Sequence, residues 1–404
     1  MQITIFLWQM TSMVGTVSKV FSRVIVKNVL IILGTILIFF VSIQLMAAGF
    51  GHLGQGLATS IIEVTSNPFI ALFIGLLITA IIQSSSTTTS MVVALVASGS
   101  ISLEQAIPII IGANIGTTIT STIVSLSYIT KTAEFRKAIT AGTVHDLFNI
   151  LLAVILLPLE LNYQFLSSAS YYIADAFPWI YEGKSEFIGF SRIFDPIGNL
   201  MIHSIGAIFT ILVSFLLLIS TVKLISSQLY NQWIGQTKTL VDNAIFSHKY
   251  KSFGLGLIIT SIVQSSSLTT SLMVPMVATG KVKISRAFEF ILGANLGTTI
   301  TAILAALFKS EAAMSLAVAH FLFNLIGVLL FMTIPFLEKI TTNLADKLGY
   351  LTLRNRITGF VYILFTFFII PFGLIYFSTQ LEEEPFKKVS QVPEVEKTEG
   401  ALDD

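Results

Sequence analysis

Long apolar runs separated by short polar breaks dominate the chain. Val29–Phe50 carries no charged side chain, and at about 1.5 Å per residue a helix of this length crosses about 30 Å of hydrocarbon. This pattern predicts an all-α polytopic membrane protein. Further spans are expected at Glu104–Leu126, Ala138–Leu159, Leu200–Leu218, Ala287–Leu307, Ala313–Phe336 and Ile357–Phe377.

One uncharged polar octet, QSSSTTTS, stands at Gln83–Ser90 between two apolar arms, Pro68–Ile82 and Met91–Ala97. Each arm is too short to cross a bilayer comfortably. Hydroxyl and amide groups in hydrocarbon are costly unless they are hydrogen-bonded, so the octet must meet protein, water or a ligand. The pattern predicts a re-entrant hairpin. A second octet, QSSSLTTS at Gln264–Ser271, lies between Gly254–Val263 and Leu272–Gly280 and predicts a second hairpin.

The second octet is part of a longer internal repeat. Gly75–Thr120 aligns without a gap on Gly256–Thr301, 181 residues later, with 26 of 46 positions identical. The repeat includes GANIGTT at Gly112–Thr118 and GANLGTT at Gly293–Thr299. Their glycines, with Asn and Thr, favour local unwinding of a membrane helix. We therefore expect an interrupted transmembrane helix in each repeat.

A later echo, HDLFN and HFLFN, extends the repeat from His145 to His320. Each repeat then has a span, a hairpin and two more spans, and three crossings are odd. The second repeat is therefore expected in inverted topology, and the C-terminal tail on the outer side. Basic loop residues support this topology, because they fall on the predicted cytoplasmic side. They are Lys131, Arg136, Lys137, Lys249, Lys251, Lys281, Lys283, Arg286, Lys339, Lys347, Arg354 and Arg356.

Six segments follow from this pattern. An interfacial segment at residues 1–28 precedes the first repeat at 29–160, and an external connection at 161–198 joins it to the second repeat at 199–337. A loop and a final span occupy 338–379, and a charged, disordered tail is expected at 380–404. The first residues lack a basic region and a small-residue cleavage site, so no cleaved signal peptide is expected.

Composition narrows the class further. Of 404 residues 54% are hydrophobic and 11% charged, whereas soluble domains carry about 25% charged residues. The net charge of +1 predicts no nucleic-acid partner, and the absence of cysteine excludes disulfides and thiolate metal sites. The lipid bilayer is the expected surrounding, and the oligomeric state is left open.

The repeated motifs suit a substrate site near the bilayer midplane. Interrupted helices of inverted repeats line transporter sites, freed N–H groups attract anions, and hydroxyls and carbonyls suit a hard cation such as Na⁺. No Lys or Arg lies in either hairpin, so co-bound Na⁺ is the expected positive charge for a polyanion. Asp146 is a further cation-ligand candidate because an ionisable residue inside a span is functional by default. The other predicted cation ligands are Asn114, Thr117, Thr118, Asn295, Thr298 and Thr299. For His145 and His320 a neutral imidazole bonded to a nearby carbonyl is preferred over a functional role.

The motifs QSSS, GANIGTT, EFRKA and TVHDLFN closely resemble the type II sodium–phosphate cotransporter family, over about Val29 to Phe336. The resemblance implies Na⁺-driven uptake of inorganic phosphate across the cell (inner) membrane. It assigns the substrate region to Gln83, Ser84, Ser85, Ser86, Gln264, Ser265, Ser266 and Ser267. It also links an acid near Asp146 to a transport cycle that moves net charge. The chain departs from the animal proteins by a shorter outer connection without cysteine, and from many bacterial members by a short tail.

Other functions remain open at this point. The chain could carry another oxyanion or a dicarboxylate with Na⁺, or form an anion channel. Ser-rich segments in membrane helices also serve close helix packing, but two copies in register favour a ligand site. An enzyme is disfavoured, because a catalytic triad would not need two inverted copies. The sequence thus predicts a secondary active transporter that works by alternating access.

Overall fold

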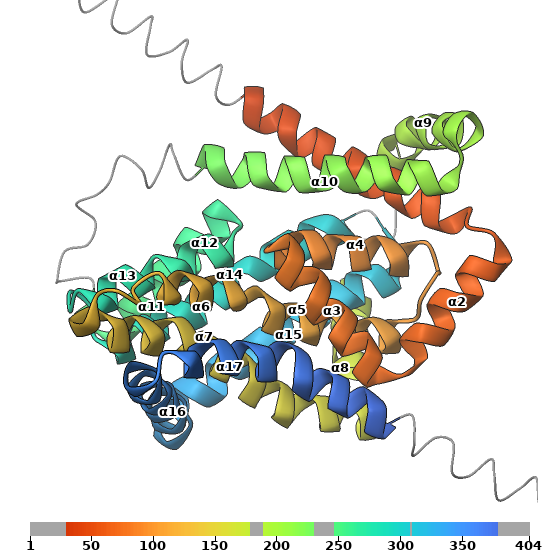
Figure 1. The fold of residues 1–404 in the computed structure, drawn as a ribbon. Coiled ribbons are helices and arrows are strands. Elements are labelled where there is room, and N and C mark those ends of the chain that lie inside the picture. Colours follow the sequence, from red (N-terminus) through yellow and green to blue (C-terminus); the bar gives the residue numbers. More distant parts are fainter. Residues whose placement is uncertain (1–29, 178–188, 230–245, 308, 379–404) are drawn as a thin grey trace, which may run out of the picture.

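The computed structural model describes residues 30–177, 189–229, 246–307 and 309–378, which form helices and no strands. Within these ranges seven helices are long and apolar enough to cross a membrane. An all-α polytopic membrane protein is therefore confirmed (Figure 1). The predicted interfacial segment at 1–28 and the predicted tail at 380–404 lie outside the described residues. The first described helix begins at Leu30.

The first repeat begins with the helix Leu30–Gly51. A bend of 103° at Asn67 then separates α2 (Gln55–Ser66) from α3 (Pro68–Ile82). The Asn67 side chain accepts hydrogen bonds from two N–H groups of the first turn of α3, and Pro68 stands at a position where a missing N–H costs nothing. The remaining helices of this half are α4 (Ser85–Ala97), α5 (Leu103–Thr117), α6 (Ile119–Leu126), α7 (Thr132–Tyr163) and α8 (Phe165–Asp175).

The second half begins with α9 (Gly189–Ile205) and α10 (Ala207–Leu229), which are separated by Gly206 at a φ of 83°. The expected span at Leu200–Leu218 is therefore wrong in its start, because the left-handed glycine breaks the helix inside it. The hairpin and the spans after it are α11 (Lys249–Val263), α12 (Ser266–Ser271), α13 (Met273–Ala278), α14 (Ile284–Ala306) and α15 (Glu311–Thr333).

Three segments expected as loops are helical. The 161–198 connection contains α8 and the start of α9, and α7 already begins at Thr132. The loop after residue 338 is the helix α16 (Pro335–Arg354), which packs against α7. Arg136 of α7 donates two hydrogen bonds to Asp346 of α16, at 2.6 and 3.2 Å. A helix with charged residues on its outer face lacks the long apolar run by which spans were recognised.

The GAN segments do not unwind, and this expectation is wrong. The second lies within the continuous helix α14, and in the first only Thr118 separates α5 from α6, with right-handed dihedral angles. A Cβ on Gly112 would lie 1.8 Å from the carbonyl oxygen of Leu72, and one on Gly293 2.0 Å from that of Phe253. The glycines therefore permit close contact between each hairpin arm and the helix beside it, as small residues do in membrane helices.

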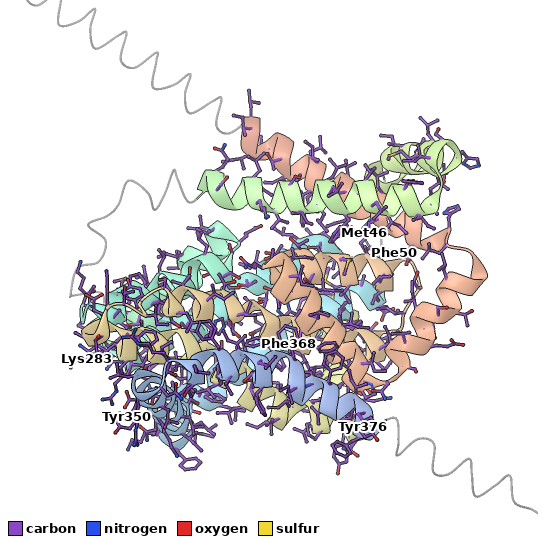
Figure 2. The ribbon with its side chains drawn as sticks, viewed as in Figure 1. Met46, Phe50, Lys283, Tyr350, Phe368 and Tyr376 are labelled. Atoms are coloured by element: carbon purple, nitrogen blue, oxygen red, sulfur yellow. The ribbon has the colours of Figure 1, made fainter. Side chains whose placement is uncertain are left out.

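Several basic residues of the second hairpin and its neighbours lie at one end of the molecule. Lys283 and Tyr350 lie at this end, and Tyr376 lies at the other (Figure 2). The Lys137 ammonium is 3.5 Å from the position of a Cβ on Gly280, and Lys249 donates to the carbonyl of Met332 at 2.9 Å. The predicted cytoplasmic side would carry such a cluster, and the assignment of the sides stays a prediction.

Candidate functional site

The two hairpin tips have the same local structure. Gln83 and Gln264 end α3 and α11 in the left-handed conformation, at φ of 58° and 54°. Ser84 and Ser265 then cap α4 and α12, and each hydroxyl accepts a backbone N–H three residues on. Most of each octet is therefore helical, and only its first two residues form the turn at the hairpin tip.

The tips contact each other reciprocally. The Ser86 hydroxyl donates to the carbonyl oxygen of Gln264 at 3.1 Å, and the Ser267 hydroxyl donates to that of Gln83 at 3.4 Å. Ser86 corresponds to Ser267 in the repeat, and Gln83 to Gln264. Reciprocal contacts of this kind are what a two-fold relation between the copies would produce. The structure thus brings together the QSSS segments that sequence placed apart.

Ser85 and Ser266 have different surroundings from their neighbours. Both side chains are buried, and in the described part of the chain no hydrogen bond engages either hydroxyl. They stand at the first helical positions of α4 and α12, where backbone N–H groups also lack intrahelical partners. Donors of this kind, at the place where two tips meet, suit an oxyanion.

Behind the tips, two asparagines of the GAN segments bind side chains of the opposite repeat. Asn295 accepts from Nε2 of His145 at 2.7 Å and donates to Asn149 at 2.9 Å. Asn114 accepts from Nε2 of His320 at 3.3 Å and from Asn324 at 3.4 Å. Each imidazole is therefore bonded to an amide carbonyl, as preferred from the sequence. Asn149 and Asn324 were missed as site residues, although the HDLFN and HFLFN echo pointed to them.

The four threonines predicted as cation ligands bond to their own helices. Thr117 and Thr298 donate to the carbonyl four residues earlier, at 2.9 and 3.0 Å, and Thr118 and Thr299 to the carbonyl three residues earlier, at 2.7 and 2.6 Å. Such back-bonding leaves the oxygen lone pairs available. The side chains of all four are buried.

Asp146 is fully buried in α7. Its Oδ2 accepts from the Thr122 hydroxyl at 2.7 Å and from the Tyr362 hydroxyl at 3.1 Å, whereas Oδ1 has no partner among the described residues. Tyr362 lies in α17 (Ile357–Leu364), which continues through a π-helix at Phe365–Ile369. Sequence reasoning missed both hydroxyls, because neither belongs to a repeated motif.

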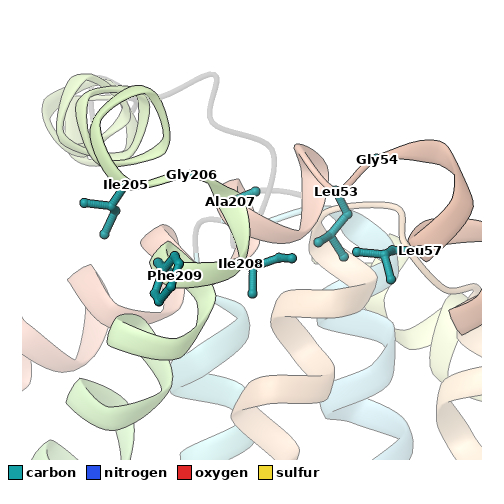
Figure 3. Close-up of a pocket in the computed structure, with 8 residues that line it drawn as sticks. All are labelled: Leu53, Gly54, Leu57, Ile205, Gly206, Ala207, Ile208 and Phe209. Carbon is teal, nitrogen blue, oxygen red and sulfur yellow. The ribbon is translucent and has the colours of Figure 1, made fainter.

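A pocket of about 340 Å³ lies elsewhere, between the end of the first helix and the joint of α9 and α10 (Figure 3). The residues that line it are Leu53, Gly54, Leu57, Ile205, Gly206, Ala207, Ile208 and Phe209. None of the predicted site residues reaches it. Its apolar walls do not suit an oxyanion or Na⁺.

Comparison with known proteins places the chain in a family. The family model described as Na⁺/Pi-cotransporter matches residues 38–160 and 217–379. Sodium-dependent phosphate transport protein 2B of Homo sapiens is 29% identical, over 86% of this chain and 65% of its own length. The 2B protein of Pongo abelii is 29% identical over 91% and 68%, and the 2A protein of Oryctolagus cuniculus 31% over 83% and 65%.

The chain spans about two thirds of the length of these curated relatives. No solved structure matches it. The family model covers both repeats, including both QSSS and both GAN segments. The chain therefore belongs to the Na⁺/Pi-cotransporter family, whose members are transporters and not enzymes.

Proposed function

We propose that this protein couples inward movement of Na⁺ to uptake of inorganic phosphate by alternating access, as a multi-pass protein of the cell (inner) membrane. The single observation that carries the proposal is the reciprocal contact of the two QSSS tips, with the Ser85 and Ser266 hydroxyls unengaged beside it. The names of the relatives, sodium-dependent phosphate transport proteins, support the choice of solutes.

Phosphate is proposed to bind where the tips meet. Ser85 and Ser266 would donate their hydroxyls, and the first N–H groups of α4 and α12 would point at the same oxyanion. Ser86 and Ser267 would hold the two tips at their spacing. Ser84 and Ser265 would act as helix caps and Gln83 and Gln264 as the left-handed turns, so all eight residues serve the site in different ways.

Na⁺ is proposed to bind close by as cargo and to supply the positive charge that the hairpin tips lack. The candidate ligands are the hard oxygens of Asn114, Thr117, Thr118, Asn295, Thr298, Thr299 and Asp146. The asparagine oxygens already accept hydrogen bonds across the repeats. Cation binding there would therefore be linked to the contacts that hold the repeats together.

The repeats are proposed to be inverted with respect to the membrane. In Figure 1 the first hairpin, α3 and α4, lies toward the right, and the second, α11 to α13, toward the left, so that the tips approach from opposite sides. A site reached from both sides through two equivalent hairpins suits alternating access. Cysteines introduced near Ser98 and Thr279 should label from opposite sides, and labelling of both from one side would contradict inversion.

Uptake of radiolabelled phosphate into proteoliposomes tests the function. We expect accumulation above the external concentration with an inward Na⁺ gradient and none with an equal K⁺ gradient. Uptake without any need for a cation gradient would indicate a channel instead. Competition by arsenate alone would support phosphate, whereas stronger competition by sulfate or succinate would assign another anion.

A further inference from the structure

Hydrogen bonds hold the carboxylate of Asp146 at only one of its two oxygens, although the Thr118 hydroxyl also lies beside the carboxylate. Thr122 of α6 and Tyr362 of α17 both donate to Oδ2, and Oδ1 is buried without a partner among the described residues. No ion pair engages Asp146 in this part of the chain. A buried carboxylate oxygen without a donor is strongly unfavourable unless a ligand satisfies it.

The backbone of α17 explains how Tyr362 reaches this carboxylate. Gly359 packs so closely that a Cβ there would lie 3.0 Å from Leu126 of α6 and 3.1 Å from Thr352 of α16. Tyr362 is one turn beyond Gly359, and Thr122 is one turn before Leu126, so the two hydroxyls come to the same level. A π-helix begins at Phe365, directly after this turn, and such segments are frequent at functional sites.

Among the described residues this arrangement occurs once. In the second repeat Phe321 stands at the position of Asp146, and Ile303 at that of Thr122. The final span has no counterpart in the first repeat. Otherwise α17 presents mainly apolar side chains, and Phe360, Val361 and Leu364 are all exposed. The one hydroxyl directed at a buried carboxylate therefore contrasts with the remainder of its helix.

We propose that Tyr362 is a positioning residue for Na⁺ coupling: with Thr122 it fixes Asp146 through Oδ2 and leaves Oδ1 to the cation. The proposal rests on the proposed function, in which Asp146 is a Na⁺ ligand. It makes the unrepeated last span part of the coupling machinery. A purely structural role would be an anchor of α17 to the core, and that role predicts no selective change in the response to Na⁺.

Tyr362→Phe is the main variant, because it removes the hydroxyl and keeps the ring. The matched control is Tyr376→Phe in the same helical run, at a side chain 61% exposed. For Tyr362→Phe we expect the Na⁺ concentration for half-maximal phosphate uptake to rise about ten-fold, which corresponds to one hydrogen bond to a charged group. At saturating Na⁺ the phosphate concentration for half-maximal uptake should stay unchanged.

A readout independent of transport is the Na⁺ concentration that half-maximally raises the melting temperature of the purified protein. This midpoint should rise with Tyr362→Phe and stay at the wild-type value with Tyr376→Phe. In an Asp146→Asn background Tyr362→Phe should add no further shift. If Tyr362→Phe does not fold, Thr122→Val should raise the same midpoint, whereas Thr122→Ser, which keeps the hydroxyl, should not.

Two results would overturn the proposal. One is a Na⁺ midpoint in Tyr362→Phe within two-fold of the control, and the other is an equal shift with and without Asp146. Failure of the proposed function is a different outcome, because wild-type vesicles would then show no Na⁺-dependent phosphate uptake. The melting measurement would still report whether Na⁺ binds through Asp146 and Tyr362.

Discussion

The hairpin tips of the two repeats are nearly equivalent, whereas the surroundings of Asp146 and its counterpart Phe321 differ completely. Ser86 and Ser267 each bond to the opposite tip, and both tips turn through a left-handed glutamine. Asp146, by contrast, binds Thr122 and Tyr362, for which the second repeat has no equivalents. The two copies thus share the structure of their tips, whereas the carboxylate of Asp146 stands in the first copy and a phenylalanine takes its place in the second.

The hydrogen bonds behind the tips are less alike in the two repeats than the tips are, and more alike than the surroundings of Asp146 and Phe321. Both histidines bond to an asparagine of the other repeat, but the Asn295 contacts are 2.7 and 2.9 Å and those of Asn114 are 3.3 and 3.4 Å. The residue pairs are equivalent, but the contact lengths differ and so does the direction of the bond between the asparagines: Asn295 donates to Asn149, whereas Asn114 accepts from Asn324. Substitutions made in pairs, one in each repeat, can therefore separate what is shared from what has diverged.

The largest expected loss of stability concerns a feature that both repeats share, the close packing of a hairpin glycine against the neighbouring helix. A Cβ on Gly75 would lie 1.9 Å from the carbonyl oxygen of Ile109, and one on Gly256 2.0 Å from that of Phe290. We expect Gly75→Ala and Gly256→Ala to lower the free energy of unfolding equally, by about 3 kcal/mol or more. Thermal melting in detergent measures this, with Gly34→Ala as a control because nothing lies within 4 Å of its Cβ position. Markedly unequal losses would contradict the equivalence of the hairpin arms.

The next largest loss of stability is expected from removal of the GAN asparagines, and it should differ between the repeats. Asn295→Ala leaves a buried imidazole N–H and the Asn149 amide oxygen without partners, which costs about 3 kcal/mol. Asn114→Ala should cost only about 1–2 kcal/mol, because its contacts to His320 and Asn324 are longer. Melting temperatures measure the difference. We also expect both variants to need more Na⁺ for uptake, and an unchanged Na⁺ dependence in both would remove these residues from the cation site.

Removal of the unengaged tip hydroxyls tests the phosphate site. We expect Ser85→Ala and Ser266→Ala each to raise the phosphate concentration for half-maximal uptake roughly ten-fold, because an oxyanion loses one donor in a dry site. Stability should hardly change, since neither hydroxyl has a partner among the described residues. Ser220→Ala is the control, at an exposed hydroxyl bonded to its own helix in α10. Unchanged uptake in both tip variants would mean that the octets serve packing alone.

The smallest effect is expected for the contact between the tips. Ser267→Ala removes one neutral hydrogen bond, at a cost of about 0.5–1.5 kcal/mol. Ser86→Ala removes the bond to Gln264 and also a 3.4 Å contact with the Thr301 hydroxyl. The shorter Ser86 contact should cost slightly more. The free-energy cost of the double substitution should differ from the sum of the two single costs, because both bonds close the same contact. Strict additivity in melting temperature would indicate that the tips behave independently.

Spans, hairpins and the repeat could be predicted from the sequence because each depends on local composition. The end of the span Val29–Phe50 and the start of the span Ile357–Phe377 were placed to within one residue, since hydrocarbon thickness sets the length of an apolar run. The α16 helix was missed because its charged face obscures the apolar one, and the start of α10 was misplaced because Gly206 interrupts an apolar run.

The sequence by itself determined the class of protein, the duplication and the polar segments that must meet one another, because an unsatisfied polar group in hydrocarbon admits few alternatives. Only the tertiary structure decided the role of each residue. The GAN glycines serve close packing instead of unwinding, and Ser84 and Ser265 are caps while Ser85 and Ser266 stay unengaged. Tyr362 joins Asp146 across 216 positions of the chain. Such contacts depend on how helices pack, and no local pattern of residues records that geometry.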